Sequence, residues 1–172
     1  IESALSECKF KMKRLKTVIN LAPADIRKEG SGFDLPMAIG ILAASGQISE
    51  EKLSDFIFMG ELSLDGGLQP VKGALPIAIQ ARKEGYKGII LPKANAKEAA
   101  IVKDLLVYGV DKLTEVTAFL EGKSTLEPTQ MNASVAIDVI HNEQFDCGGN
   151  VSYHNSLYYD GYYIGSINKK SL

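Results

Sequence analysis

The stretch "KEGSGFDLPMAIGILAASG", residues 28–46, decides the interpretation of the whole chain. A polar, glycine-containing loop leads into a run that is apolar nearly all round. Asp34 is placed to cap a helix over Leu35–Ser45, and Pro36 falls in its first turn, where a missing N–H does no harm. Gly46 is a typical stop signal. A helix without a polar face is typical of a domain centre, so we expect this helix to be buried.

Strand and helix patterns alternate around this central helix. The Asp65-Gly66 pair predicts a hairpin turn, and Asn95 is placed to cap a helix. The alternation predicts an α/β or α+β fold, a mixed sheet with helices packed on it. The expected strands are Leu15–Pro23, Phe56–Leu62, Leu68–Val71, Lys87–Pro92 and Leu105–Val110, and the expected helices are Gly73–Gly85, Asn95–Asp104 and Lys112–Gly122.

The amino-acid composition and the hydrophobic pattern change after Gly122. Residues 123–130, "KSTLEPTQ", are typical of a linker, and residues 131–172 form a tail that holds five of the seven tyrosines. Asp160-Gly161 lies between aromatic stretches and predicts a β-hairpin. The tyrosines could stack on nucleic-acid bases, but aromatic cross-strand pairs explain them more simply. They are Tyr153, Tyr158, Tyr159, Tyr162 and Tyr163.

Composition excludes several classes of protein. The 172 residues carry 19 basic and 21 acidic side chains, a formal charge of −2, so nucleic acid would need a local basic patch. The cysteines, Cys8 and Cys147, are too few for a disulfide framework. His141, Cys147 and His154 are irregularly spaced, so we expect no metal site. No apolar run approaches the ~18–20 residues of a membrane helix, and the first residues do not resemble a signal peptide. We expect a cytoplasmic protein.

Three long motifs resemble one family. They are "INLAPADIRKEGSGFDLPMAIGILAASG", "MGELSLDGGLQPVKGALPIAIQARKEGYKGIILP" and "VTAFLEG". Together they are similar to the N-terminal domain of the magnesium-chelatase-like AAA+ proteins, the YifB and competence protein ComM family. That domain is similar to the proteolytic domain of Lon and has the ribosomal-protein-S5 domain-2-like fold. The resemblance covers residues 1–122.

The chain departs from the family pattern at both ends. It begins part-way into the pattern, without the strands that precede "IESALSEC", so we expect an unpaired sheet edge that a neighbouring copy or the tail hairpin could cover. Past Glu127-Pro128 the family continues into an ATPase module, whereas this sequence has no G-x-x-x-x-G-K-[ST] motif. The resemblance assigns ATP and Mg²⁺ to full-length relatives, and we expect no cofactor in this chain.

The Lon resemblance makes the chemistry of residues 28–46 testable. Lon-type proteases use a serine activated by a lysine base, since a serine hydroxyl alone is a poor nucleophile. In this sequence the serine position holds Met37 and the lysine position, in "PVKGALP", holds Leu75. Ser31, Ser45 and Lys72 are poor substitutes, because Ser45 lies at the far end of the helix and Lys72 is expected to face away from it. We expect Met37 to fill the core and the domain to lack protease activity.

Two further segments could bind ligands. The first is "KFKMKRLK", whose alternating basic residues would share one face of an extended segment and follow a DNA backbone, although a solvated edge explains them more simply. These residues are Lys9, Lys11, Lys13, Arg14 and Lys16. The second is the loop Gly30-Ser31-Gly32 before the helix, which could hold a phosphate or carboxylate but is short enough to be a plain connector.

The resemblance implies a role in DNA processing. ComM-type proteins are hexameric ATPases that drive branch migration in natural transformation, so this domain would be a non-catalytic scaffold or a DNA-guiding module that self-associates. The basic segment and the loop Arg27–Phe33 would be its contact surfaces. Two alternatives stay open, a residual Lon-type serine peptidase or hydrolase and a small anion- or nucleotide-binding domain.

Overall fold

The computed structural model describes residues 1–11, 17–19, 32–130, 156–159 and 162–166. Most of the expected strand Leu15–Pro23 lies outside these residues, and residues 17–19 belong to no helix or strand. The described elements are α1 (Glu2–Glu7), α2 (Asp34–Ala44), the 3-10 helix η1 (Leu53–Asp55), β1 (Phe56–Phe58), β2 (Glu61–Leu62), β3 (Leu68–Gln69), α3 (Ala74–Lys83), β4 (Gly88–Pro92), α4 (Lys93–Ala99), β5 (Leu106–Val110), α5 (Leu113–Leu120), β6 (Ser156–Tyr159) and β7 (Tyr162–Ser166).

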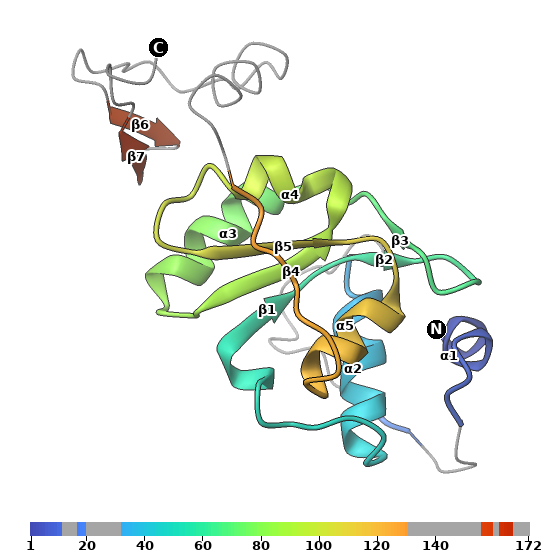
Figure 1. Cartoon of the computed structure of the whole chain (residues 1–172). Coiled ribbons are helices and arrows are strands. Elements are labelled where there is room, and N and C mark those ends of the chain that lie inside the picture. The colour runs from blue at the N-terminus through green and yellow to red at the C-terminus, as the bar shows by residue number, and fades with distance from the viewer. Residues whose placement is uncertain (12–16, 20–31, 131–155, 160–161, 167–172) are drawn as a thin grey trace.

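A parallel sheet forms the middle of three layers. Its strand order is β1-β4-β5, and Ile57 pairs with Ile89, which pairs with Val107. Helices α3 and α4 cover one face, and α2 and α5 lie on the other side (Figure 1). This arrangement confirms the predicted fold class of a sheet with packed helices. The antiparallel pairs expected in a mixed sheet occur as separate hairpins, β2–β3 and β6–β7.

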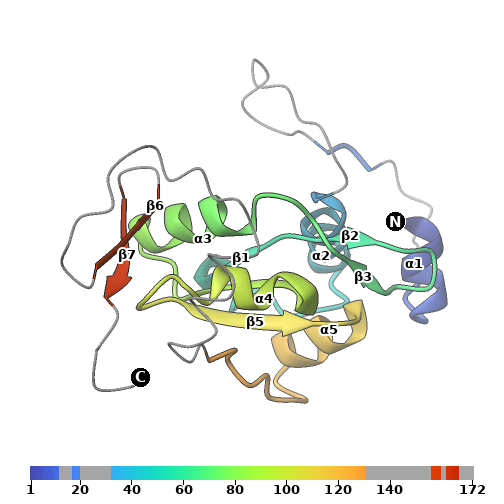
Figure 2. The same cartoon turned by 90° about the horizontal axis from the view of Figure 1, so that it is seen from above.

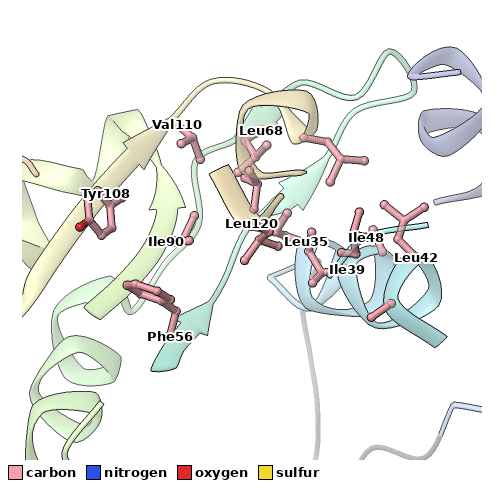
Figure 3. Close-up of a cluster of buried hydrophobic side chains, with 14 of the residues drawn as sticks. Leu35, Ile39, Leu42, Ile48, Phe56, Leu68, Ile90, Tyr108, Val110 and Leu120 are labelled. Carbon is pink, nitrogen blue, oxygen red and sulfur yellow. The ribbon is translucent and has the colours of Figure 1, made fainter. Parts of the chain in front are cut away.

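The core divides into two clusters because successive residues of β4 point to opposite faces of the sheet. Ile90 belongs to the cluster with α2 and α5, where the ring of Phe56 contacts that of Tyr108 edge-on with centroids 5.8 Å apart (Figure 3). Ile89 and Leu91 belong to the cluster with α3 and α4. All three β4 side chains are fully buried, as expected for a parallel strand covered on both faces.

Helix α2 begins one residue earlier than predicted, and fewer of its side chains are buried than predicted. Phe33 occupies the N-cap position, and the predicted cap by Asp34 is wrong. The Asp34 carboxylate instead accepts a hydrogen bond from the backbone N–H of Leu62 at 3.2 Å, which joins the helix to β2. Leu35 and Leu42 are buried, whereas Met37 is only partly buried. The expectation that Met37 fills the core is therefore wrong.

The predicted cap of α4 by Asn95 is also wrong. The helix begins at Lys93, with Pro92 at the N-cap, so Asn95 lies inside it. Its buried side-chain amide accepts a hydrogen bond from the Val71 N–H at 3.0 Å and donates one to the Val71 carbonyl at 2.8 Å. Asn95 therefore pairs with the segment before α3 in the way that a neighbouring strand would.

The Asp65-Gly66 turn is confirmed, but the strand predicted before it is divided in two. Residues 56–58 pair with β4, whereas residues 61–62 form the hairpin with β3. The Asp65 carboxylate accepts hydrogen bonds from the Ser63 hydroxyl and the Gly67 N–H, and these bonds lower the pKa of Asp65. Gly66 has φ +82°, which favours glycine.

The segment after α5 and the tail hairpin follow the predicted secondary structure. Residues 123–130 contain no helix or strand, but Leu126 packs against the core and the Thr129 N–H donates to the Val107 carbonyl at 2.7 Å. The expected linker thus lies against the domain. In the hairpin, the backbone register pairs Tyr158 with Tyr163 and Tyr159 with Tyr162. Tyr153 lies outside the described residues.

Helix α1 was not predicted from the sequence. It lies beside the β2–β3 hairpin (Figure 2), buries Ala4 and Leu5, and ends at Glu7 with Cys8 at the C-cap. A Cβ atom on Gly66 would come within 2.4 Å of the Cys8 sulfur, so the thiol packs directly on the hairpin turn. Burial raises the pKa of Cys8, and the carboxylates of Glu7 and Asp65 raise it further.

This environment predicts slow alkylation of Cys8. Because the thiolate is the reactive form, a raised pKa reduces the reactive fraction at pH 8. In a chain with Cys147→Ser, iodoacetamide should modify Cys8 more slowly than it modifies the urea-unfolded chain, and the rate should still be rising above pH 9. A native rate equal to the unfolded rate would contradict the packing of Cys8 on Gly66.

Candidate functional site

The two positions that carry catalysis in Lon-type proteases lie in different environments. Met37 lies on the outer side of α2 in a groove of about 390 Å³, named here the outer groove. Leu75 is 2% exposed and belongs to the cluster between the sheet and α3/α4. The outer groove is lined by Thr17, Val18, Ile19, Phe33, Pro36, Met37, Gly40, Ile41 and Ala44.

The first turn of α3 is fixed by side chains of α4. The Leu75 N–H donates to the Glu98 carboxylate at 3.0 Å, and Asn95 holds Val71 four residues earlier. Gly73 at the N-cap has φ +83° and provides no side-chain cap, so Glu98 satisfies an N–H that the helix leaves unpaired. The lysine position is therefore occupied by the apolar side chain of Leu75, and its backbone N–H is hydrogen-bonded to Glu98.

A second groove lies beside β1. It has a volume of about 660 Å³ and is named here the edge groove. Lys72 is exposed and lines this groove together with Gly32 and Phe33, which precede α2. The lining residues are Gly32, Phe33, Ile57, Phe58, Met59, Glu61, Pro70, Val71, Lys72 and Ile77.

Neither groove contains a nucleophile–base pair among the described residues. No serine, cysteine or histidine of the described chain lines either groove. Ser45 lies just after α2, where its hydroxyl donates to the Leu42 carbonyl at 3.0 Å, and Ser31 lies outside the described residues. Both grooves are lined mainly by apolar residues, and of the two the edge groove alone has charged lining residues, Glu61 and Lys72.

The predicted basic stripe is only partly described. Lys9 and Lys11 are exposed, whereas Lys13, Arg14 and Lys16 lie outside the described residues. Lys9 has φ +68° and follows α1, so the extended alternation does not run through it. The backbone of Lys11 is held by the Gln47 side chain, which accepts from its N–H and donates to its carbonyl, both at 2.9 Å.

The predicted anion loop and metal candidates fall mostly outside the structure described. Gly30 and Ser31 are not described, and the Gly32 carbonyl accepts a hydrogen bond from the Gly60 N–H at 2.9 Å. His141, Cys147 and His154 are also outside. Over the residues that are described, no three His, Cys, Asp or Glu side chains gather in a way that could hold a metal ion.

Sequence reasoning missed the features that shape this site. The edge groove depends on which strands pair with β1, and no local pattern reports that. Asn95 and Glu98 are at positions i and i+3 of α4 and therefore share a face of that helix. That spacing was a usable signal, although it does not reveal that their partners are the backbones of Val71 and Leu75.

Comparisons with known proteins show which family the chain resembles. The family model described as subunit ChlI of Mg-chelatase matches residues 1–95. The competence protein ComM of Haemophilus influenzae is 44% identical over 126 residues, 73% of this chain and 25% of that protein. The uncharacterized protein YifB of Escherichia coli is 40% identical over 141 residues, 82% of this chain and 28% of that protein.

A more distant similarity connects the chain with proteases. Lon protease 2 of Syntrophobacter fumaroxidans is 34% identical over 79 residues, 46% of this chain and 10% of the protease. The chain spans only about a quarter of the length of ComM and YifB. Within the part of the chain that the structure describes, no helix is both long and apolar enough to cross a bilayer.

Proposed function

Because the chain belongs to the magnesium-chelatase-like family of ChlI, ComM and YifB, we propose that its Lon-like domain is a non-catalytic binding and assembly module. In the whole protein it would act beside an AAA+ ATPase module in DNA processing and branch migration during natural transformation. It would work in the cytoplasm and would associate with other copies of itself. The full-length protein would be a hexamer. The ATP and Mg²⁺ requirement would reside in the ATPase module.

The observation that carries this proposal is the environment of Leu75. A lysine base would need to present a free amine to a nucleophile, but this position is buried among apolar side chains and its backbone N–H is bonded to Glu98. Met37, at the nucleophile position, has a thioether that cannot be deprotonated. Binding therefore accounts for the open apolar surfaces better than hydrolysis does.

Covalent labelling tests the absence of hydrolytic chemistry. A fluorophosphonate probe should leave the native chain unlabelled under conditions in which an active Lon protease is labelled. Casein hydrolysis by the same sample should match a buffer blank. Stoichiometric labelling that disappears on heat denaturation would overturn the proposal and favour a residual serine peptidase.

DNA binding is tested by fluorescence anisotropy with labelled single-stranded DNA. We expect binding that weakens as salt rises, because each neutralised phosphate releases counterions. The double variant Lys9→Glu, Lys11→Glu should weaken binding about tenfold or more at low salt, since it replaces two attractive contacts with two repulsive ones.

The matched control is Lys97→Glu, Lys103→Glu, which makes the same change in net charge at two exposed lysines on and after α4. This control should bind DNA much more tightly than the Lys9 and Lys11 variant. Equal weakening by the two double variants would show that only net charge matters. No binding by the wild-type chain at low salt would leave the domain an assembly module.

A further inference from the structure

The segment that follows α5 is attached to that helix at its start. This segment, residues 123–130, is named here the strap. The N–H groups of Lys123 and Ser124 both donate to the Ala118 carbonyl, at 2.8 and 3.2 Å. Gly122, between the helix and the strap, has φ +70°, as is typical of the residue that follows a helix ending in this way. Backbone hydrogen bonds therefore fix the direction in which the chain leaves α5.

The far end of the strap is bonded to the last strand in the described order β1-β4-β5. The N–H of Leu106 in β5 donates to the carbonyl of Lys87, next to β4. Because backbone groups of successive strand residues point to opposite sides, the Val107 carbonyl points away from β4. The Thr129 N–H donates to that carbonyl at 2.7 Å, and the strap passes beside β5 in both views (Figures 1 and 2).

The middle of the strap contacts the core through side chains. Leu126 is half-buried and packs against the cluster with α2 and α5. Tyr108 of the same cluster is 7% exposed, and its ring lies 5.8 Å from that of Phe56 and 5.4 Å from that of Phe119 between centroids. Burial raises the pKa of Tyr108, and the carboxylate of Glu127 raises it further, so Glu127 also lies near this ring.

We propose that the strap is a rigid connection and that it fixes the point beside β5 from which the following chain leaves the domain. Neighbouring attachments from Ser124 to Thr129 are at most two residues apart, and the ring of Pro128 fixes one more φ angle. The inference rests on the proposed function in one respect, that an ATPase module follows in the whole protein. A rigid strap would transmit a movement of that module to β5, whereas a flexible linker would not.

Trypsin cleavage after Lys123 in the full 172-residue chain tests the strap. Lys123 is exposed, but a protease binds its substrate in an extended conformation, so the strap must be released before this bond is cut. The bond should be cut about tenfold or more slowly than the same bond in a peptide of residues 118–130. Mass spectrometry of the fragments identifies this cleavage among the others.

A pair of matched variants shows whether packing of the strap causes the protection. Leu126→Asp places a carboxylate at the half-buried position and should speed the cleavage about tenfold or more, relative to a peptide with the same change. The control Thr125→Asp makes the same change in charge at the neighbouring exposed residue and should cleave like the wild-type chain. Circular dichroism of both variants should remain native.

Hydrogen exchange of the Thr129 N–H requires no substitution. Its bond to the Val107 carbonyl should slow exchange about a hundredfold or more relative to the same peptide. Two-dimensional NMR of the wild-type chain measures this rate even if Leu126→Asp does not fold.

Three results would overturn the proposal. These are wild-type cleavage after Lys123 at the rate of the peptide, Thr129 exchange at the rate of the peptide, and equal cleavage rates for folded Leu126→Asp and Thr125→Asp. A flexible strap would leave the expected results of the labelling and DNA measurements unchanged, so the proposed function is tested separately.

Discussion

Leu75→Lys, which places the lysine of Lon-type proteases at its corresponding position, should lower the free energy of unfolding by about 3 kcal/mol or more. The change removes an apolar side chain that is 2% exposed and packs in the cluster of α3, α4 and β4. It also requires an ammonium group to be buried or to disrupt the packing around it. Urea unfolding followed by circular dichroism at pH 7 measures the loss.

Glu98 could not form an ion pair with the Leu75→Lys ammonium group without losing hydrogen bonds that it already makes. Its carboxylate already accepts hydrogen bonds from the Leu75 N–H at 3.0 Å and from the Asn95 amide at 3.4 Å. A lysine that recruited this carboxylate would compete with both donors. The control Leu75→Met keeps the volume and apolar character, and should cost less than about 1.5 kcal/mol. A loss below about 1 kcal/mol for Leu75→Lys would show that the position is open to water.

The positions that correspond to the Lon serine and lysine, Met37 and Leu75, therefore differ in burial and in their importance for stability. Met37 is half-buried at the outer groove, where a serine would meet solvent on one side. Leu75 is part of the core and holds the first turn of α3 in place. The serine position could be restored with little structural cost, whereas the lysine position is closed by packing. That asymmetry supports our proposal that the domain binds instead of catalysing a reaction.

Elements that depend on local signals were predicted well from the sequence. The Asp65-Gly66 turn is confirmed because glycine permits the positive φ that the tight turn requires. Helix α3 lies between Gly73 and Gly85, both with φ above +80°, as the sequence predicts. Strand β4 was predicted from a short apolar run, and it is buried on both faces.

Features that depend on distant partners were not predictable. Asp34 and Asn95 have the residue types of helix caps, yet each bonds a backbone group 28 or 24 residues away. The apolar pattern of α2 indicates burial, but whether all of its faces are covered depends on the elements that pack around it. Helix α1 is only six residues long and is stabilised by packing of Ala4 and Leu5, so it has too few turns to show a period.

Asn95→Ala should lower the free energy of unfolding by about 2–3 kcal/mol, because two hydrogen bonds to a partly buried backbone are lost together. The bonds join the Asn95 amide to the N–H and carbonyl of Val71 at 3.0 and 2.8 Å, and Asn95 is 8% exposed. Removal of the amide leaves both Val71 groups without their partner and frees the segment that leads to Gly73 and Leu75. Thermal and urea unfolding both measure the effect.

The chain contains its own matched control, since Gln47 makes the same two bonds to Lys11, both at 2.9 Å, but at the surface. Water can replace those bonds, so Gln47→Ala should cost less than about 1 kcal/mol. Asn95→Asp should lose nearly as much as Asn95→Ala, because a carboxylate cannot donate to the Val71 carbonyl and would lie beside Glu98. Equal losses for Asn95→Ala and Gln47→Ala would mean that burial does not set the strength of these contacts. In that case the first turn of α3 would be held mainly by Glu98, and the rigidity of the lysine position would no longer depend on Asn95.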